Sequence, residues 1–337
     1  MAEMTSAGWW RSLGMEGIVM FSWGDPIYQQ IASAIVAAGV RLVQVTDTHG
    51  VISPLADASA HLRVHWEHRW NESVWQKIAR TVLALPTAYL IRPLTKDRAR
   101  VRMMTTGVAF CGATPEAVER YRRLVRRLAG AEAAKRIHLL PIPVNPAFDF
   151  SENDIKQDQV IALGRWDMLQ KRWQLLADTI AIAIARRHGT RFRIFGKTPP
   201  EMLAWHAGLP AEHRARIVIE GFVPNDEVAL AFRHARVMLV SSAYEGCHIA
   251  SAEAVCSGAS VVGCRSPFLS AVAWHTSADS GQLANRAAPS ELAATLLDEL
   301  ELWDRDVRNP HAISRTWCQV FHADKVARRA IEIGAGA

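Results

Sequence analysis

Short apolar runs alternate with longer amphipathic stretches along most of the chain. The short runs are bounded by glycine or other small residues and predict buried strands, whereas the longer stretches repeat apolar residues at helical spacing. Strands and helices that alternate through short connections predict an α/β fold with parallel sheets. The expected strands are residues 17–21, 41–46, 108–111, 137–142, 160–163, 191–195, 217–220 and 237–240, with one more after Gly258.

The stretches between these strands predict the helices and the domains. The expected helices span residues 26–38, 173–187, 225–234, 290–304 and 311–332, with others within 61–100 and from Thr114 onward. The chain of 337 residues is longer than one ordinary core, and the Pro- and Asn-rich segment 143–150 is typical of a linker. We therefore expect two Rossmann-like domains, over 1–146 and 147–312, and a C-terminal helix over 313–337 that packs back toward the first domain.

The stretch 237–262 holds a buried strand, a loop with Glu245 and Gly246, a helix through Glu253 and a second strand. This order makes a parallel βαβ unit, whose ligands gather at the carboxyl ends of its strands. The helix start offers N–H groups and the positive end of a dipole, which suit a diphosphate. Glu245 and Glu253 would then bind sugar hydroxyls beside it. Spacing alone leaves open that both are ordinary solvated carboxylates, because glutamate is favoured near helix starts and in loops.

The positive charge is concentrated in the first half of the chain. Residues 1–150 hold 18 Lys and Arg against 12 Asp and Glu, whereas residues 151–337 hold 21 of each kind, which leaves a formal net charge of +6. Much of the excess lies in 92–102 and 120–127. It forms either a solubilising helix face or a surface that attracts an anionic lipid leaflet or a phosphorylated acceptor. A nucleic-acid partner is not expected, because no recognisable binding module accompanies the charge.

Cysteine spacing and hydropathy predict the compartment. The five cysteines follow no metal-binding or Cys-x-x-Cys spacing, which is typical of reduced thiols in the cytoplasm. The best apolar run, 82–91, contains Pro86 and is too short to span a bilayer. The first residues lack the basic and apolar regions of a signal peptide. We expect a cytoplasmic protein that can lie against the inner face of the membrane.

Four motifs occur in order over the second half of the chain: GRWDMLQK (164–171), FRIFGK (192–197), IVIEGFVPNDEVALAFRHARVMLVSS (217–242) and EGCHIASAEAVCSGASVV (245–262). Together they resemble the nucleotide-sugar-binding domain of retaining glycosyltransferases of group 1, the glycogen-synthase-like family with the GT-B fold. The earlier VTDTHG (45–50) and GVAFCGATPEAV (107–118) fit the first domain of that family, and LLPIPVNPAFD (139–149) fits its interdomain crossing.

The resemblance implies transfer of a sugar from a nucleotide-diphosphate sugar, with retention of anomeric configuration and without a metal ion or other cofactor. Arg165 and Lys171 match the family's phosphate-binding pair, which stabilises the departing diphosphate. Glu245 would contact hydroxyls of the transferred sugar. These three residues are the expected catalytic group.

The remaining expected site residues bind the donor. By the resemblance, Glu253 holds the ribose diol, the backbone near Val223 lies along the base, and His49 faces the cleft near the reacting centre. The glycines at strand ends let the backbone approach the ligand, and the amides after the first glutamate face the diphosphate or the sugar. These residues are Gly164, Gly196, Gly246, Cys247, His248 and Ile249.

The chain also departs from the family pattern. Cys247, His248 and Ala250 replace the small and aromatic residues that usually follow the first glutamate, so the sugar pocket is expected to differ. The family normally places a strand, a Gly-rich loop and two further strands before the element that matches 17–21, and this sequence shows none of them. The first domain is therefore expected to be shortened at its N-terminus.

Two functions remain open from the sequence. The first is an active glycosyltransferase that uses a glycan or lipid-linked acceptor, as in cell-envelope polysaccharide synthesis. The second is a catalytically weak or inactive relative that binds a sugar nucleotide and serves as a partner subunit. The four residues Arg165, Lys171, Glu245 and Glu253 favour the first, and the shortened first domain favours the second.

Overall fold

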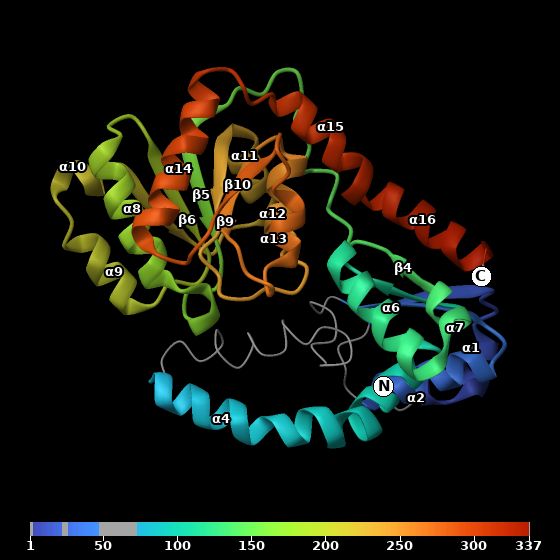
Figure 1. Ribbon diagram of the computed structural model, residues 1–337. Helices are drawn as coiled ribbons and strands as arrows, with labels where there is room; N and C mark the ends of the chain where they lie inside the picture. Colours follow the sequence, from blue (N-terminus) through green and yellow to red (C-terminus); the bar gives the residue numbers. More distant parts are fainter. Residues whose placement is uncertain (1–2, 22–25, 47–72, 337) are drawn as a thin grey trace. The chain divides into compact units, whose positions relative to one another are not determined.

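The computed structural model describes residues 3–21, 26–46 and 73–336 (Figure 1). The chain forms two compact units, Met1–Ile142 with Val326–Ala337, and Pro143–Lys325. Each unit contains one parallel sheet with helices packed against it, which confirms the predicted α/β class. The second unit runs to Lys325, beyond the boundary expected at 312, because a helix after that boundary packs within this unit.

The sheet of the first unit has the strand order β1-β2-β3-β4, and every pair is parallel. Its strands are β1 (Gly17–Phe21), β2 (Arg41–Thr46), β3 (Ala109–Gly112) and β4 (Ile137–Leu139). β4 is shorter than the expected 137–142. The accompanying helices are η1 (Glu3–Thr5), α1 (Ala7–Ser12), α2 (Pro26–Ala37), α6 (Pro115–Ala129), α7 (Ala131–Lys135) and α16 (Ala323–Gly336).

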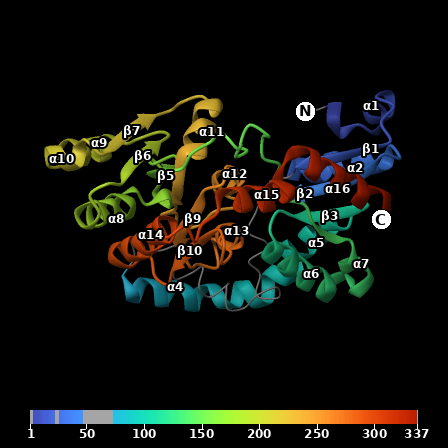
Figure 2. The ribbon, with the colours of Figure 1, turned by 90° about the horizontal axis from the view of Figure 1, so that it is seen from above.

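Both faces of this sheet are covered, because successive residues of a strand point to opposite sides. Leu42 of β2 packs with Ile35 of α2 on one face. The next residue, Val43, packs on the other face with Val326 and Ala330 of α16. Figure 2 shows α16 beside β2 and β3. The last helix of the chain therefore completes the core of the first unit.

A long helical segment also belongs to the first unit. It comprises α4 (Val74–Pro86), the π-helical turns η2 (Thr87–Ile91) and η3 (Pro93–Asp97), and α5 (Arg98–Met104). A capping box between Ser73 and Gln76 starts α4, and no residue of α4 is buried. The sequence predicted helix within 61–100, of which residues 61–72 lie outside the described part of the chain.

One arginine of the expected basic face is buried. Arg120 on α6 is 1% exposed, and its guanidinium donates to the Glu116 carboxylate over 2.6 Å. Arg122, two residues later, donates to the backbone carbonyl of Ile137 in β4. Arg122 therefore ties α6 to β4, whereas the bond between Arg120 and Glu116 lies within α6. The prediction of a uniformly solvated or anion-binding surface over 120–127 is wrong for Arg120, because the side chain lies in the core.

The sheet of the second unit has the order β10-β9-β8-β5-β6-β7, again with parallel pairs. Its strands are β5 (Gln157–Leu163), β6 (Arg191–Phe195), β7 (Ile217–Gly221), β8 (Ala235–Leu239), β9 (Ser260–Cys264) and β10 (Gly281–Ala284). Figure 1 shows α8 and α14 on one side of this sheet and α11, α12 and α13 on the other. The helices of the unit are η4 (Leu169–Lys171), α8 (Trp173–Arg186), α9 (Pro200–Ala207), α10 (Ala211–Arg214), α11 (Asn225–His234), α12 (Ile249–Cys256), α13 (Ser270–His275), α14 (Pro289–Asp304) and α15 (Pro310–Phe321).

The helix expected over 311–332 is wrong as a single element, because α15 and α16 are separated at His322. The backbone of His322 is extended, with ψ 140°, and it forms a parallel bridge with Val144. The Val144 N–H also donates to the Phe321 carbonyl over 2.8 Å. The chain segment that enters the second unit and the segment that leaves it are thus bonded to each other.

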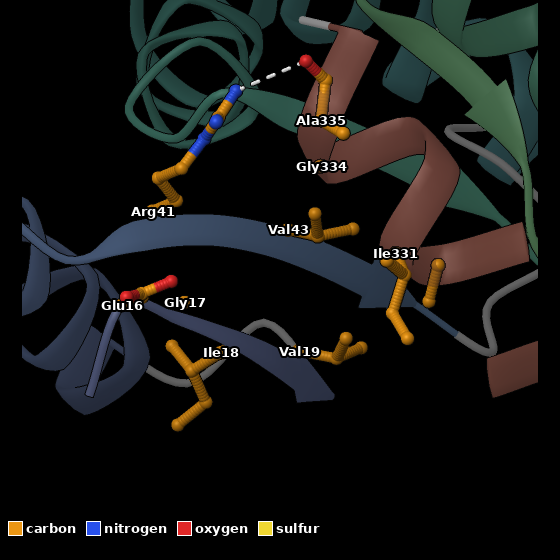
Figure 3. Close-up of a pocket in the computed structure, with 10 residues that line it drawn as sticks. Glu16, Gly17, Ile18, Val19, Arg41, Val43, Ile331, Gly334 and Ala335 are labelled. Atoms are coloured by element: carbon orange, nitrogen blue, oxygen red, sulfur yellow. Dashed lines mark hydrogen bonds between the residues drawn. The ribbon is translucent and has the colours of Figure 1, made fainter. Parts of the chain in front are cut away.

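A cavity of about 370 Å³ lies in the first unit between the β1–β2 edge and α16 (Figure 3). Its lining is mainly aliphatic, with Val19, Val43 and Ile331 among the side chains drawn. Arg41 donates to the Ala335 carbonyl over 3.4 Å. This cavity lacks the cluster of cations that a diphosphate requires. None of the helices within the described ranges has both the length and the apolar content that crossing a bilayer demands.

Candidate functional site

A larger cavity, of about 780 Å³, lies in the second unit at the carboxyl ends of β5, β6 and β7. Parallel strands end at the same edge of a sheet, so the residues that follow them converge there. Arg165 and Lys171 follow β5, and Lys197 follows β6. Among the described residues that line this cavity are these three cations and no carboxylate. The cavity is therefore suited to an anion.

Two glycines let the strand ends come together at this edge. Gly196 has φ +103°, and a Cβ atom there would collide with the carbonyl group of Gly164. The Gly196 N–H donates to the Gly221 carbonyl over 2.6 Å. Trp166 fixes the loop after β5, because its indole N–H donates to the Phe195 carbonyl over 2.8 Å. Gly164 and Gly196, both predicted to allow close approach of a ligand, line the cavity.

Lys171 and Glu245 lie side by side, although 74 residues separate them in the sequence. The Lys171 ammonium group donates to Glu245 Oε1 over 2.6 Å, and both side chains are largely buried. The backbone carbonyl of Lys171 accepts a hydrogen bond from Ser241 Oγ over 2.7 Å. Since an ammonium group has three donors, Lys171 can bind a phosphate oxygen while it keeps Glu245 in place.

The charge of Glu245 depends on this pairing. Burial raises the pKa of the Glu245 carboxyl, but the proximity of His248 and of Lys171 lowers it by more, so the pKa lies below its ordinary value. Burial also lowers the pKa of His248 to about 4, which leaves this imidazole neutral at pH 7. We therefore regard Lys171 as the group that keeps Glu245 ionised at neutral pH.

His248 belongs to a buried hydrogen-bonded group of three side chains. Its backbone is left-handed, with φ +43°, and its Nδ1 lies 2.8 Å from Ser251 Oγ. The same hydroxyl lies 2.6 Å from Nδ1 of His275. Burial lowers the pKa of His275 to about 3. The two neutral imidazoles fix the loop that carries Glu245 to the start of α12.

Glu253 lies one turn after Ala250, and Ala250 lines the cavity whereas Glu253 does not. The Glu253 carboxylate forms no hydrogen bond or ion pair with any residue that the structure describes. Burial raises the pKa of Glu253 to about 7. A carboxyl group in this state gains from hydroxyl donors, which would stabilise its ionised form.

The structure places the other predicted site residues as follows. Val223 lines the cavity. Gly246, Cys247 and His248 connect Glu245 to Ile249, the first residue of α12, and these four residues are not among those that line the cavity. His49 lies outside the described residues. Arg165 lines the cavity with a side chain that is 66% exposed, 3.7 Å from Asp167.

Lys197 and Phe222 are the most informative of the lining residues that were not predicted as site residues from the sequence. Lys197 Nζ lies 2.9 Å from the Asp167 carboxylate, and its hydrogen bond is the main cause that lowers the pKa of Asp167. Phe222 is 92% exposed at the rim, next to Val223. The signal for Lys197 was available, because this cation directly follows the strand-end Gly196.

Comparison with known proteins identifies the part of the chain that holds this cavity. Residues 157–301 match the family model described as glycosyl transferases group 1. These residues form a group 1 glycosyltransferase domain. The group 1 family expected from the four sequence motifs is confirmed for this part of the chain, and that family is one of transferases. No curated protein matches the sequence.

Solved glycosyltransferase structures resemble the chain beyond this domain. HepE of Anabaena in complex with UDP and glucose has a TM-score of 0.61 and 14% identity, over 95% of this chain and 78% of that one. The lipopolysaccharide outer core galactosyltransferase WaaB has a TM-score of 0.57 and 16% identity, over 97% and 77%. The pneumococcal O-GlcNAc transferase GtfA with UDP and GlcNAc has a TM-score of 0.62 and 13% identity, over 98% and 59%. These similarities confirm the GT-B fold.

Proposed function

We propose that the glycosyltransferase domain binds a nucleotide-diphosphate sugar in the 780 Å³ cavity and that the protein transfers the sugar to a hydroxyl group of a glycan or lipid-linked acceptor. The observation that supports this most strongly is that Arg165, Lys171 and Lys197 are the charged residues among the described lining of the cavity, with Glu245 bonded to Lys171 just outside it. UDP is the first nucleotide to test, because HepE and GtfA are described in complex with it.

The proposed reaction breaks the bond between the anomeric carbon and the diphosphate oxygen. The cations stabilise the charge that develops on the diphosphate, so no metal ion is required for this role. Glu245 accepts hydrogen bonds from sugar hydroxyls while Lys171 holds it. The acceptor oxygen attacks from the face that the diphosphate leaves, and its proton passes to the departing phosphate oxygen. Attack from this face retains the anomeric configuration.

Donor turnover by the full chain tests this proposal. The wild type should bind UDP-sugars in calorimetry and release UDP by slow hydrolysis or by transfer, also with a chelator present. Glu245→Ala should abolish release, whereas Glu212→Ala should not, because Glu212 is an exposed carboxylate on α10. Failure of every common nucleotide sugar to bind would refute the proposal.

Binding without turnover would favour the alternative, a partner subunit that holds a sugar nucleotide. One observation supports this second function: in the described residues the first sheet has four strands with β1 at its edge, against six in the second sheet. An acceptor-side sheet of this size offers fewer strand ends for binding an acceptor.

We also propose that α4 contacts an anionic lipid surface near a lipid-linked acceptor. Trp75 and Leu83 are 79% and 76% exposed on this helix, and Lys77 and Arg80 lie between them in sequence. Exposed apolar side chains with adjacent cations are typical of helices that lie in the membrane interface.

Sedimentation with vesicles that contain phosphatidylglycerol tests this contact. Binding should decrease as salt rises, and Trp75→Ser should weaken it further. Leu230→Ser, which removes an apolar side chain that is 48% exposed on α11 of the other unit, is the control. Binding that is indifferent to lipid charge and to salt would contradict the contact.

A further inference from the structure

A cluster of metal-binding side chains lies in the second unit, away from the donor cavity. The sulfur atoms of Cys256 and Cys318 and a ring nitrogen of His322 all lie within 4.8 Å of one another. Cys256 is the last residue of α12, Cys318 lies on α15, and His322 directly follows α15. None of the three lines the 780 Å³ cavity. The steps proposed for sugar transfer leave this cluster unused.

The two cysteines of the cluster have different surroundings: one is completely buried, and the other lies next to a carboxylate. Cys256 is fully buried and Cys318 is 8% exposed. The Cys318 sulfur lies 3.8 Å from Oδ1 of Asp149, an exposed carboxylate that also accepts a hydrogen bond from Ser314 Oγ over 3.1 Å. An oxygen donor therefore lies next to the Cys318 sulfur, on an exposed side chain outside the group of three.

We propose that Cys256, Cys318 and His322 bind one divalent cation of the zinc class, and that the exposed Asp149 carboxylate turns from its position beside Cys318 to become the fourth ligand. Two sulfurs, one imidazole and one carboxylate are donors that zinc accepts in tetrahedral sites. Ligand atoms around such an ion lie about 3.3–3.8 Å apart, so the atoms of the two cysteines and His322, which lie within 4.8 Å of one another, must move closer by about 1–1.5 Å at most. Binding replaces the two thiol protons, which pass to solvent.

One ring nitrogen of His322 lies near a backbone carbonyl, so the proposal assigns the other nitrogen, Nδ1, as the ligand atom. His322 Nε2 lies 3.4 Å from the Phe148 carbonyl oxygen. Metal-binding histidines commonly donate their other N–H to a backbone carbonyl, which orients the ring toward the cation. Phe148 precedes Asp149 in the sequence, so one short segment supplies both the fourth ligand and this acceptor.

The position of the cluster indicates a structural role. Asp149 lies six residues after the start of the second unit at Pro143, and His322 lies three residues before its end at Lys325. A bound cation would join these two segments to Cys256, three residues after Glu253 on the same helix. It would stabilise the second unit and hold α12 in place.

Cobalt substitution tests the site, because Co²⁺ occupies zinc sites and absorbs strongly when thiolates bind it. The untagged full chain is stripped with a chelator under reducing conditions and titrated with Co²⁺ and then Zn²⁺. We expect one Co²⁺ per chain with a thiolate-to-cobalt charge-transfer band, displacement by Zn²⁺ and a higher melting temperature. Cys318→Ser and His322→Gln should each weaken binding by about tenfold or more.

Cys264→Ser is the matched control, because Cys264 is a buried thiol of the same unit outside the cluster. It should bind Co²⁺ as the wild type does. His322→Gln keeps the test informative if a cysteine variant misfolds, since His322 is only partly buried. No charge-transfer band, binding that survives both variants, or a Cys256–Cys318 disulfide in the reduced preparation would overturn the proposal. Sugar transfer is not the readout, so failure here leaves the proposed function untouched.

Discussion

At the scale of single residues, the pair of Lys171 and Glu245 is the central feature of the candidate site. The 2.6 Å contact prepares both groups before any ligand binds. A preorganised charge pair costs little to order when the proposed diphosphate ligand binds, which is the condition for strong electrostatic stabilisation. It also explains how a carboxylate can lie next to a phosphate site without repelling the ligand.

Removal of either expected phosphate ligand should weaken binding of a nucleoside diphosphate. Lys171→Ala and Arg165→Ala should each cost about 1.5–3 kcal/mol, because charge-assisted hydrogen bonds are lost. Isothermal titration with UDP measures this. Arg191→Ala removes an exposed arginine at the opposite end of β6 and should leave the affinity unchanged. Equal affinities in all three variants would exclude the phosphate role.

Glu253 predicts a dependence of donor affinity on pH. The pKa of about 7 means that the carboxyl group is mostly protonated at pH 6 and mostly ionised at pH 8. If the ionised form accepts the ribose hydroxyls, affinity rises with pH by about tenfold over this range, and binding releases a proton below pH 7. UDP-glucose is the appropriate ligand, because its phosphates do not titrate near neutrality.

The variant Glu253→Gln supplies the control for this pH dependence. It should flatten the profile, because the amide does not ionise. It should also stabilise the folded protein at pH 8 by about 1–3 kcal/mol, since a carboxyl with a raised pKa destabilises the folded state above that pKa. An unchanged slope in Glu253→Gln would assign the titration to another group.

At the scale of elements, the connection from β7 to α11 forms one rim of the donor cavity. Val223 and the 92% exposed Phe222 lie there. An aromatic ring at the rim can stack on a nucleobase, which contributes about 1–3 kcal/mol per base in nucleic-acid complexes. We predict that Phe222→Ala lowers UDP affinity by about tenfold.

The same substitution should leave inorganic pyrophosphate binding unchanged, because that ligand has no base. Competition titrations with UDP and pyrophosphate separate the two contributions. Equal losses for both ligands would show that Phe222 acts through the shape of the loop.

The elements with strong periodic signals were predictable from the sequence. Strands β1, β2 and β6 and helix α11 have the predicted ends, because apolar residues and strand-end glycines mark their limits. The short elements α9, α10, α13 and β10 were missed, because each is too short to show a period. The break at His322 was missed as well, since it depends on a bridge to Val144, which is distant in sequence.

The candidate site was predictable as a set of residue types but not as a network. The motifs located Arg165, Lys171 and Glu245 at strand ends, and the structure brings Lys171 and Glu245 together. The pairing of His248 with His275 through Ser251 could not be predicted, because it needs side chains from α12 and α13 in one buried place. Long-range polar contacts of this kind leave no periodic trace in the sequence.

At the scale of the whole molecule, the chain enters the second unit once and returns to the first unit at its end. In the part of the chain that the structure describes, the residues that line the proposed donor cavity all belong to the second unit. The core of the first unit, in contrast, is completed by residues 326–337. Donor binding and the stability of the first unit should therefore respond to different substitutions.

Two adjacent residues of α16 test this separation. Ala330 is 6% exposed and packs with Val43 and Cys111, whereas Ile331 is 72% exposed. Ala330→Asp buries an unpaired charge and should destabilise the first unit by about 2–4 kcal/mol, whereas Ile331→Asp should have little effect. Calorimetry should show a lowered melting temperature for Ala330→Asp only. Below that temperature, the UDP affinity of this variant should match that of the wild type. A loss of UDP binding in folded Ala330→Asp would show that α16 also shapes the donor site.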